Sequence, residues 1–253
     1  MTVEAADQAA EYFPPIWVTV DLVIFTVRDG KLQVLLITRA AEPFAGMTAL
    51  PGGYVLAGET LDQAALRKLI HETGVDGGQL HLEQLRTYGD PGRDPRGRIV
   101  TVAYLALSPD IPEPRGVTED AHWAPVEATL NDTKLAFDHS RILREAVERA
   151  QSKLEYTTVA ATFCPDPFTV ADLRHIYEVV WNTSLDPSNF RRKVTRAENF
   201  LVPLGERRNS EPGRPAALYH RGPAHLLYPP LLRSPDTTRE QAPLSTHLAP
   251  GHE

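Results

Sequence analysis

The residues of this chain best suited to chemistry lie in one short segment, GYVLAGETLDQAALRKLIHETGV, at residues 53–75. Lys68, His71 and Glu72 are three and four residues apart, so they share one face of a helix. A carboxylate on such a face can bind a hard cation, but magnesium requires oxygen ligands and gains nothing from an ammonium group. The segment therefore carries one metal-type ligand on a face that also holds a lysine and a histidine.

This segment resembles the Nudix box, G-x5-E-x7-R-E-U-x-E-E-x-G-U, in which U is a bulky aliphatic residue. In that family, glutamates of the helix bind Mg²⁺ or Mn²⁺, and here Lys68 and His71 stand where two of them would be. Without the metal, the diphosphate and the attacking water lose their main activator. We therefore expect no catalytic residue, no metal site and no enzymatic activity. Seven residues match the motif at the right spacing: Gly53, Glu59, Arg67, Leu69, Glu72, Gly74 and Val75.

A loop rich in glycine, proline and arginine, residues 89–98, is a candidate for contact with a ligand. Its three arginines offer forked donors that suit a diphosphate. The alternative is a solvated hairpin tip whose charges cancel. Arg39 is likewise either an anion contact or a surface charge. The residues expected to bind an effector are Arg39, Gly53, Arg67, Glu72, Arg93 and Arg98.

The charge distribution indicates a second module that binds nucleic acid. The formal net charge of the chain is −7. Residues 186–221 nevertheless hold eight basic and four acidic side chains, a balance of +4, which leaves −11 for the remainder. Such asymmetry between parts of a chain is typical of a nucleic-acid-binding domain attached to another domain.

The first part of the chain predicts a mixed α/β domain. Asp29-Gly30 favours a two-residue hairpin turn. Thr60 and Gln63 have the spacing of a capping box, and Gly74 is placed to end the helix that begins there. The expected elements are strands at 18–27 and 32–38, a helix at 60–73, a strand at 99–107 and a helix at 140–154.

The second part predicts a winged helix-turn-helix. One helix starts near Thr169, and after a short turn Asp186-Pro187 starts the next, as an N-cap followed by proline at the first helical position. The apolar face of this second helix is expected to continue to Leu201. Two short strands, at 201–204 and 216–220, then flank a polar tip and form the wing.

The basic side chains of this part have the types that read DNA. Asn189, Arg192 and Arg196 lie opposite the apolar face, where arginine reads guanine and asparagine reads adenine in a major groove. Arg191 and Lys193 flank that face and suit phosphate. Contacts to the backbone or minor groove are expected from the wing residues Arg207, Arg208 and Arg214. For each basic residue alone, the alternative is a solvated charge.

Length and composition fit two domains in a reducing compartment. The 253 residues include one cysteine, which cannot form an internal disulfide. No apolar run approaches the roughly 20 residues of a membrane span, and the N-terminus lacks a basic region before an apolar one. We expect a cytoplasmic protein with no membrane contact. The expected divisions are a flexible N-terminus at 1–15, an effector-sensing domain at 16–155, a DNA-binding domain at 156–222 and a disordered proline-rich tail at 223–253.

Both halves together resemble the Nudix-related transcriptional regulators, NrtR, over residues 16–221. The resemblance implies an α/β (α+β) fold, with a Nudix α/β/α sandwich followed by a winged helix-turn-helix, in a homodimer that binds a pseudo-palindromic operator in double-stranded DNA. It further implies a repressor of NAD biosynthesis or salvage genes that ADP-ribose or a related metabolite releases from DNA, with no cofactor required. The supporting stretches are the degenerate helix, residues 88–98, Leu135–His139, Asn189–Lys193 and Gly213–Tyr219.

Three alternative hypotheses assign this chain a function other than repression of NAD genes. The first is an active Nudix hydrolase, an ADP-ribose pyrophosphatase, with an accessory domain. The second is a regulator of sugar-catabolism genes. The third is an adaptor that uses the winged helix to bind protein. Metal-dependent hydrolysis of ADP-ribose favours the first, and a failure to bind any promoter DNA favours the third.

Overall fold

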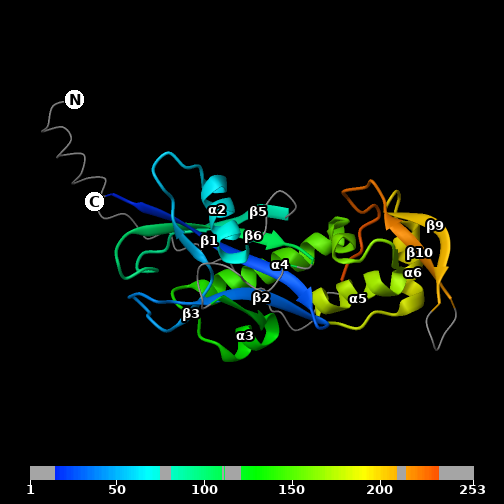
Figure 1. The fold of residues 1–253 in the computed structure, drawn as a ribbon, viewed down its shortest axis with the longest axis horizontal. Coiled ribbons are helices and arrows are strands. Elements are labelled where there is room, and N and C mark those ends of the chain that lie inside the picture. The colour runs from blue at the N-terminus through cyan, green and yellow to red at the C-terminus, as the bar shows by residue number, and fades with distance from the viewer. Residues whose placement is uncertain (1–14, 75–80, 110, 112–120, 210–214, 234–253) are drawn as a thin grey trace, which may run out of the picture.

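The computed structural model describes residues 15–74, 81–109, 111, 121–209 and 215–233 of the chain. It has two lobes, and α4 (His139–Tyr156) lies between the sheet of the first and the helices of the second (Figure 1). None of the described helices is long and apolar enough to cross a membrane.

The first lobe is built on a mixed sheet. β1 (Trp17–Arg28) and β2 (Lys31–Thr38) form the predicted hairpin, and Asp29 and Gly30 have the positive φ angles, 50° and 67°, of its turn. β1 also pairs in parallel with β6 (Ile99–Leu107). The remaining strands are β3 (Thr48–Ala49) and β7 (Ala121–Pro125) on β2, β4 (Gly52–Tyr54) on β1, and β5 (His81–Tyr88) on β6.

The two faces of β1 are buried by different helices. Leu22 and Ile24 belong to the cluster that packs against α2 (Leu61–Thr73). Val23 and Phe25 point to the opposite face and belong to the cluster that packs against α4. Side chains of a strand alternate between its faces, so an unbroken apolar run is what a strand covered on both sides requires. The predicted α/β/α sandwich is confirmed, with α3 (Val126–Asp132) beside α4.

The second lobe has the predicted winged-helix order. η2 (Val159–Phe163) and β8 (Phe168–Thr169) precede α5 (Val170–Trp181) and α6 (Pro187–Arg196), and the wing strands follow. Both helices start where expected: Thr169 and Asp172 form a capping box, and the side chain of the predicted N-cap Asp186 accepts a hydrogen bond from the Asn189 amide. The wing strands are β9 (Leu201–Arg208) and β10 (Ala216–Arg221), in a sheet of order β8-β10-β9.

Two predicted bounds in this lobe are wrong. α6 ends at Arg196, so Leu201 belongs to the wing and not to the helix. The first wing strand runs to Arg208 and not to Leu204, because pairing with β10 continues as far as Ala216. Main-chain pairing with a distant strand, rather than side-chain type, fixes where this polar strand ends.

The predicted disordered tail is also wrong in part. Residues 222–233, here called the C-terminal strap, pack against the second lobe, and Leu227 and Leu231 are buried in its core. Arg233 donates to Glu148 and Gln151 on α4. The strap has no helix or strand of its own and therefore no periodic pattern in its sequence. Its proline-rich composition alone consequently indicated disorder. Residues 234–253 of the predicted tail, and 1–14 of the predicted flexible N-terminus, lie outside the described residues.

Candidate effector pocket and nucleic-acid interface

A pocket of about 220 Å³ opens in the first lobe between β1, β4, the loop at residues 89–98 and the start of α4. Three of the predicted effector residues, Arg39, Gly53 and Arg93, line it. The volume is below the roughly 300–1,000 Å³ of sites for drug-sized ligands. A nucleoside diphosphate must therefore extend beyond this space or displace side chains. The predicted effector residues omitted the other lining residues, among them the charged and aromatic side chains of Asp21, Tyr54, Asp94, Arg96, Phe137 and His139.

Arginine side chains stack on aromatic rings at the wall of the pocket. The guanidinium carbon of Arg39 lies 4.6 Å from the centroid of the Phe137 ring, and that of Arg96 lies 5.5 Å from the same centroid. Arg96 also lies 5.4 Å from the Tyr54 ring. Burial, and then the charge of Arg96, lower the pKa of Arg39. Phe137 has a φ of 55°, which is uncommon for a non-glycine residue and is typical of ligand clamps.

The floor of the pocket is a buried charged network. Arg93 donates two hydrogen bonds to Asp138, at 2.6 and 2.9 Å, and lies 3.6 Å from Asp21. Burial acts to lower the pKa of Arg93, but the hydrogen bond to Asp138 and the charge of Asp21 raise it above its usual value. His139 Nδ1 accepts from the Leu50 amide, so the proton of the neutral ring is on Nε2, 3.6 Å from Asp21. Burial lowers the pKa of His139.

The other predicted effector residues lie outside this pocket. Arg67 donates to both carboxylate oxygens of Glu59, at 2.6 and 2.9 Å, and this hydrogen bonding lowers the pKa of Glu59 to about 2. Arg98 donates to the Gly89 carbonyl. In this structure Arg67 and Arg98 therefore hold the motif and the loop in shape. Glu72 is 2% exposed and its carboxylate lies 3.1 Å from His71 Nδ1.

The residues of the Nudix motif do not fit a divalent metal. The Lys68 side chain lies across Gly53, and Glu59 is occupied by Arg67. The four-residue spacing of Lys68 and Glu72 also allows an ion pair between them, but the carboxylate of Glu72 contacts His71 instead. Over the described ranges, no group of three or more histidine, cysteine, aspartate or glutamate side chains is placed to hold a metal ion.

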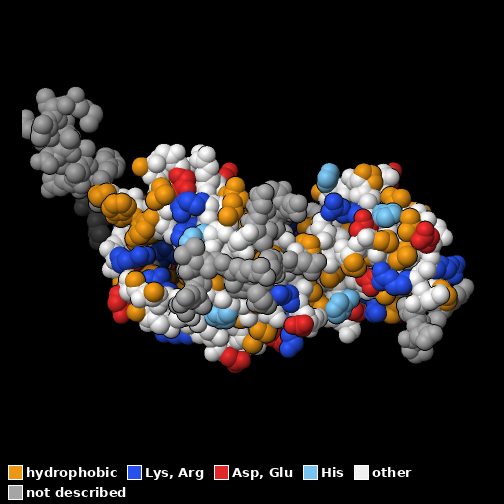
Figure 2. Space-filling view, in the orientation of Figure 1, with side chains coloured by type: hydrophobic (Ala, Val, Ile, Leu, Met, Phe, Trp, Pro, Cys, Tyr) orange, Lys and Arg blue, Asp and Glu red, His pale blue; other side chains and the backbone are white. Residues whose placement is uncertain are grey.

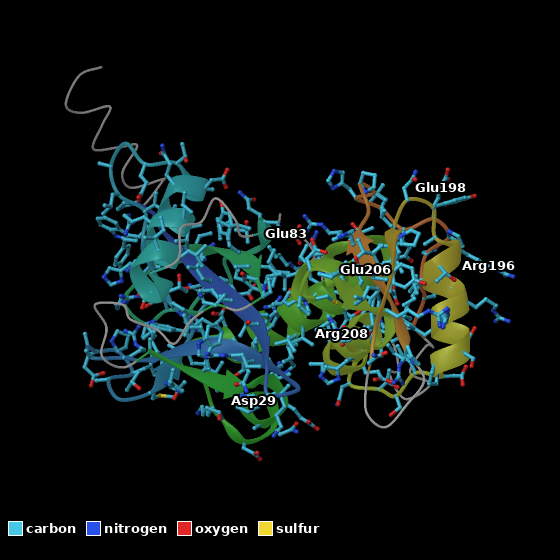
Figure 3. All side chains as sticks on the ribbon, turned by 45° about the vertical axis from the view of Figure 1, so that its right-hand side comes forward. Asp29, Glu83, Arg196, Glu198, Glu206 and Arg208 are labelled. Carbon is cyan, nitrogen blue, oxygen red and sulfur yellow. The ribbon has the colours of Figure 1, made fainter. Side chains whose placement is uncertain are left out.

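The candidate nucleic-acid interface is the outer face of α6. Phe190 and Val194 are buried on its inner face, which turns the opposite side of the helix outward. Asn189, Arg192 and Arg196 are exposed there, and Arg192 donates to the Asn189 side chain at 2.8 Å. Arg191 and Lys193 are also exposed. Figure 3 shows Arg196 pointing away from the lobe, and Figure 2 shows lysine and arginine side chains at this end of the molecule.

The arginines of the wing differ in whether their side chains are free to contact DNA. Arg207 is exposed on β9. Arg208 is exposed too, but it donates to Asp172 at 2.9 Å and to the Pro167 carbonyl at 3.0 Å. It therefore fastens the wing to α5, a role that its position in the sequence did not reveal. Arg214 lies outside the described residues.

The pocket residues that prediction missed had weak signals. Asp21 is one carboxylate inside the apolar run VTVDLVIF, and a charge in a buried strand calls for a partner. Phe137 lies between elements, where no periodicity marks it. Its neighbour His139 becomes a pocket residue only because α4 starts beside β1.

Together these features define a protein in which a Nudix-type α/β domain precedes a winged helix with an exposed basic face. Residues 17–146 match the NUDIX domain family, and residues 160–220 match the NrtR DNA-binding winged helix domain. The chain is 37% identical over 216 residues to the ADPR responsive transcriptional repressor NtrR of Acinetobacter baylyi, covering 84% of each protein. This chain belongs to the NrtR family of Nudix-related transcriptional regulators.

Two further relatives are similar to the whole chain and to its first domain, respectively. The crystal structure of Shewanella oneidensis NrtR complexed with a 27mer DNA is similar with a TM-score of 0.68 and 38% identity, over 81% of this chain and 94% of that one. The ADP-ribose pyrophosphatase of Methanocaldococcus jannaschii is 38% identical over 120 residues, which cover 47% of this chain and 66% of that enzyme.

Proposed function

We propose that this chain is a transcriptional repressor that binds operator DNA through α6 and the wing, and that ADP-ribose in the Nudix pocket releases it. The observation that carries this proposal is the combination, in one chain, of an arginine-lined pocket and an exposed basic helix, with no metal-binding cluster among the described residues. Relatives named as an ADPR responsive repressor and as a DNA complex support it. The target genes belong to NAD biosynthesis or salvage, or to sugar catabolism.

The motif supports binding of ADP-ribose without hydrolysis. A Nudix enzyme depends on its metal to activate water and to neutralise the diphosphate. Here a lysine and a histidine replace carboxylates, and Glu59 is held by Arg67. A sensor benefits from slow cleavage, because the signal stays bound. We expect turnover of ADP-ribose with Mg²⁺ far below an ordinary enzyme rate of about 1 per second.

Release of DNA requires that ADP-ribose favour one arrangement of the domains over another. A cleft of about 1050 Å³ lies between the hairpin tip at Gly30, α3 and the α5 residues His175 and Glu178, and it leaves space for such a rearrangement. Arg93 offers a link from the pocket, since its partner Asp138 is the N-cap residue of α4. Typical coupling is about 1–3 kcal/mol, or roughly 5- to 150-fold in DNA affinity.

A homodimer is part of this proposal, because helix-turn-helix dimers read the two halves of a pseudo-palindromic operator. The first lobe carries an exposed apolar patch suited to a second copy, consisting of Ile16, Trp17, Tyr54 and Leu56, which are 40–61% exposed. Figure 2 shows hydrophobic side chains gathered over the start of β1. We expect Trp17→Glu to shift the sedimentation of the full chain from dimer to monomer, whereas Leu226→Glu, at another exposed leucine, leaves a dimer.

The direct test is fluorescence anisotropy of the DNA upstream of the gene for this chain, titrated with protein with and without ADP-ribose. We expect specific binding that falls steeply with salt and weakens 5- to 150-fold with ADP-ribose. Arg192→Ala or Arg196→Ala should each cost about 1–3 kcal/mol if it reads a base. DNA binding that ADP-ribose leaves unchanged contradicts the sensor, and rapid Mg²⁺-dependent turnover supports a hydrolase instead.

A further inference from the structure

Lys68 lies on α2 against Gly53, which lines the effector pocket. Its Nζ is 3.0 Å and its Cε 2.5 Å from the point that a Cβ of residue 53 would occupy. A glycine at this position therefore leaves room for the lysine, which is half-buried. The ammonium group therefore lies next to a residue that lines the pocket, on the helix face where Nudix enzymes carry their metal ligands.

The arginines of this region already donate to acceptors within the protein. Three of them bind the carboxylates of Glu59, Asp138 and Asp94, each at 2.6 Å, and the other two donate to backbone carbonyls. By contrast, no carboxylate of the described part of the chain lies within ion-pair distance of the Lys68 ammonium. The arginines concerned are Arg39, Arg67, Arg93, Arg96 and Arg98.

The remaining carboxylate of the motif is closed to a hydrated cation. Glu72 is 2% exposed, and its oxygen lies 3.1 Å from His71 Nδ1. Magnesium gives up its waters reluctantly and prefers an octahedron of oxygen ligands. A buried carboxylate beside a histidine and a lysine does not provide one.

We propose that Lys68 takes the electrostatic place of the metal and binds the diphosphate of the effector directly. The inference rests on the proposed function, because it names the contact through which the pocket holds ADP-ribose. An ammonium group offers one positive charge and three N–H donors to phosphate oxygens. It does not coordinate a water molecule, so it cannot lower the pKa of an attacking water as a metal does. A lysine in place of the motif glutamate thus supports binding of the diphosphate and removes the metal that would activate water to cleave it.

The test is calorimetric titration of ADP-ribose into the full chain, in EDTA and in Mg²⁺. The dissociation constant of the wild type should change less than about twofold between the two conditions. Lys68→Met should weaken binding roughly 10- to 100-fold, the range for losing a hydrogen bond to a charged group. Lys134→Met removes a lysine that is exposed outside the pocket and is the matched control. Unchanged thermal melting shows that each variant is folded.

A second titration uses Mg²⁺ alone, so that it does not depend on the identity of the effector. The wild type should bind no Mg²⁺ in the millimolar range, and Lys68→Glu combined with His71→Glu should gain such binding. ADP-ribose binding that EDTA abolishes, or that Lys68→Met leaves unchanged, overturns the proposal while the proposed function stands. A wild type that binds no ADP-ribose overturns the proposed effector, and Mg²⁺ binding by that wild type overturns the displacement of the metal.

Discussion

Two adjacent leucines of the C-terminal strap have opposite surroundings, which makes them a sharp test of its packing. Leu231 is 3% exposed in the core of the second lobe, and Leu232 is 55% exposed. Truncating a buried leucine to alanine costs about 2–5 kcal/mol, because apolar burial is lost and a cavity remains. We expect Leu231→Ala to lower the free energy of unfolding by that amount, and Leu232→Ala by no more than about 0.5 kcal/mol.

Deletion of the whole strap should destabilise the protein more than a single substitution. Removing residues 223–253 exposes the site of both Leu227 and Leu231, and burying each leucine is worth about 1.5–3 kcal/mol. A loss of about 3–6 kcal/mol is large beside a total stability of about 5–15 kcal/mol. The deletion also removes Arg233, which pairs with Glu155 at 3.0 Å. Removing residues 234–253 leaves all these contacts in place and is the matched control.

Urea denaturation, followed by far-ultraviolet circular dichroism and tryptophan fluorescence, measures these effects. Trp181 is a suitable reporter because it lies in the same core and donates to the Gln151 carbonyl of α4 at 3.0 Å. Equal urea midpoints for the two deletions would contradict a stabilising role of the strap. A Leu231→Ala variant as stable as Leu232→Ala would contradict the burial of Leu231.

Two further predictions concern pH and the wing. Burial holds the pKa of His139 below the ordinary 6.5, so below about pH 6.5 the unfolded chain binds a proton that the folded chain does not. The free energy of unfolding then falls by up to about 1.4 kcal/mol for each unit that the pH drops. Between pH 7.5 and 5.5, the urea midpoint should fall less in His139→Asn than in the wild type or in the exposed control His225→Asn. Arg207→Ala should reduce the slope of log K for DNA binding against log salt concentration by about 1. Arg208→Ala breaks an ion pair with Asp172 and should leave that slope unchanged. Equal slopes for the two variants would refute the distinct roles of these arginines.

The sequence determined the elements whose signals are local. The Asp29-Gly30 turn, the Thr60 capping box and the Asp186 cap all formed as predicted, and a helix starts after Thr169 as expected. In each case the donor and the acceptor, or the two turn residues, are within four positions of one another, so residue type and spacing suffice. The Nudix motif and the basic segment likewise identified the family from short stretches. Which of the predicted residues contact the effector or DNA stays a prediction.

Only the tertiary structure decided which charged side chains remain available to a ligand. Arg93 and Asp138 are 45 positions apart, and Arg208 and Asp172 are 36 apart, so their pairing depends on how the elements pack. The same packing brought Phe137 into the pocket and fixed the strap through Arg233, 78 positions from Glu155. Sequence shows that a side chain is charged, but its partner is set by long-range packing, since partially buried charges need a counter-charge that folding alone brings near.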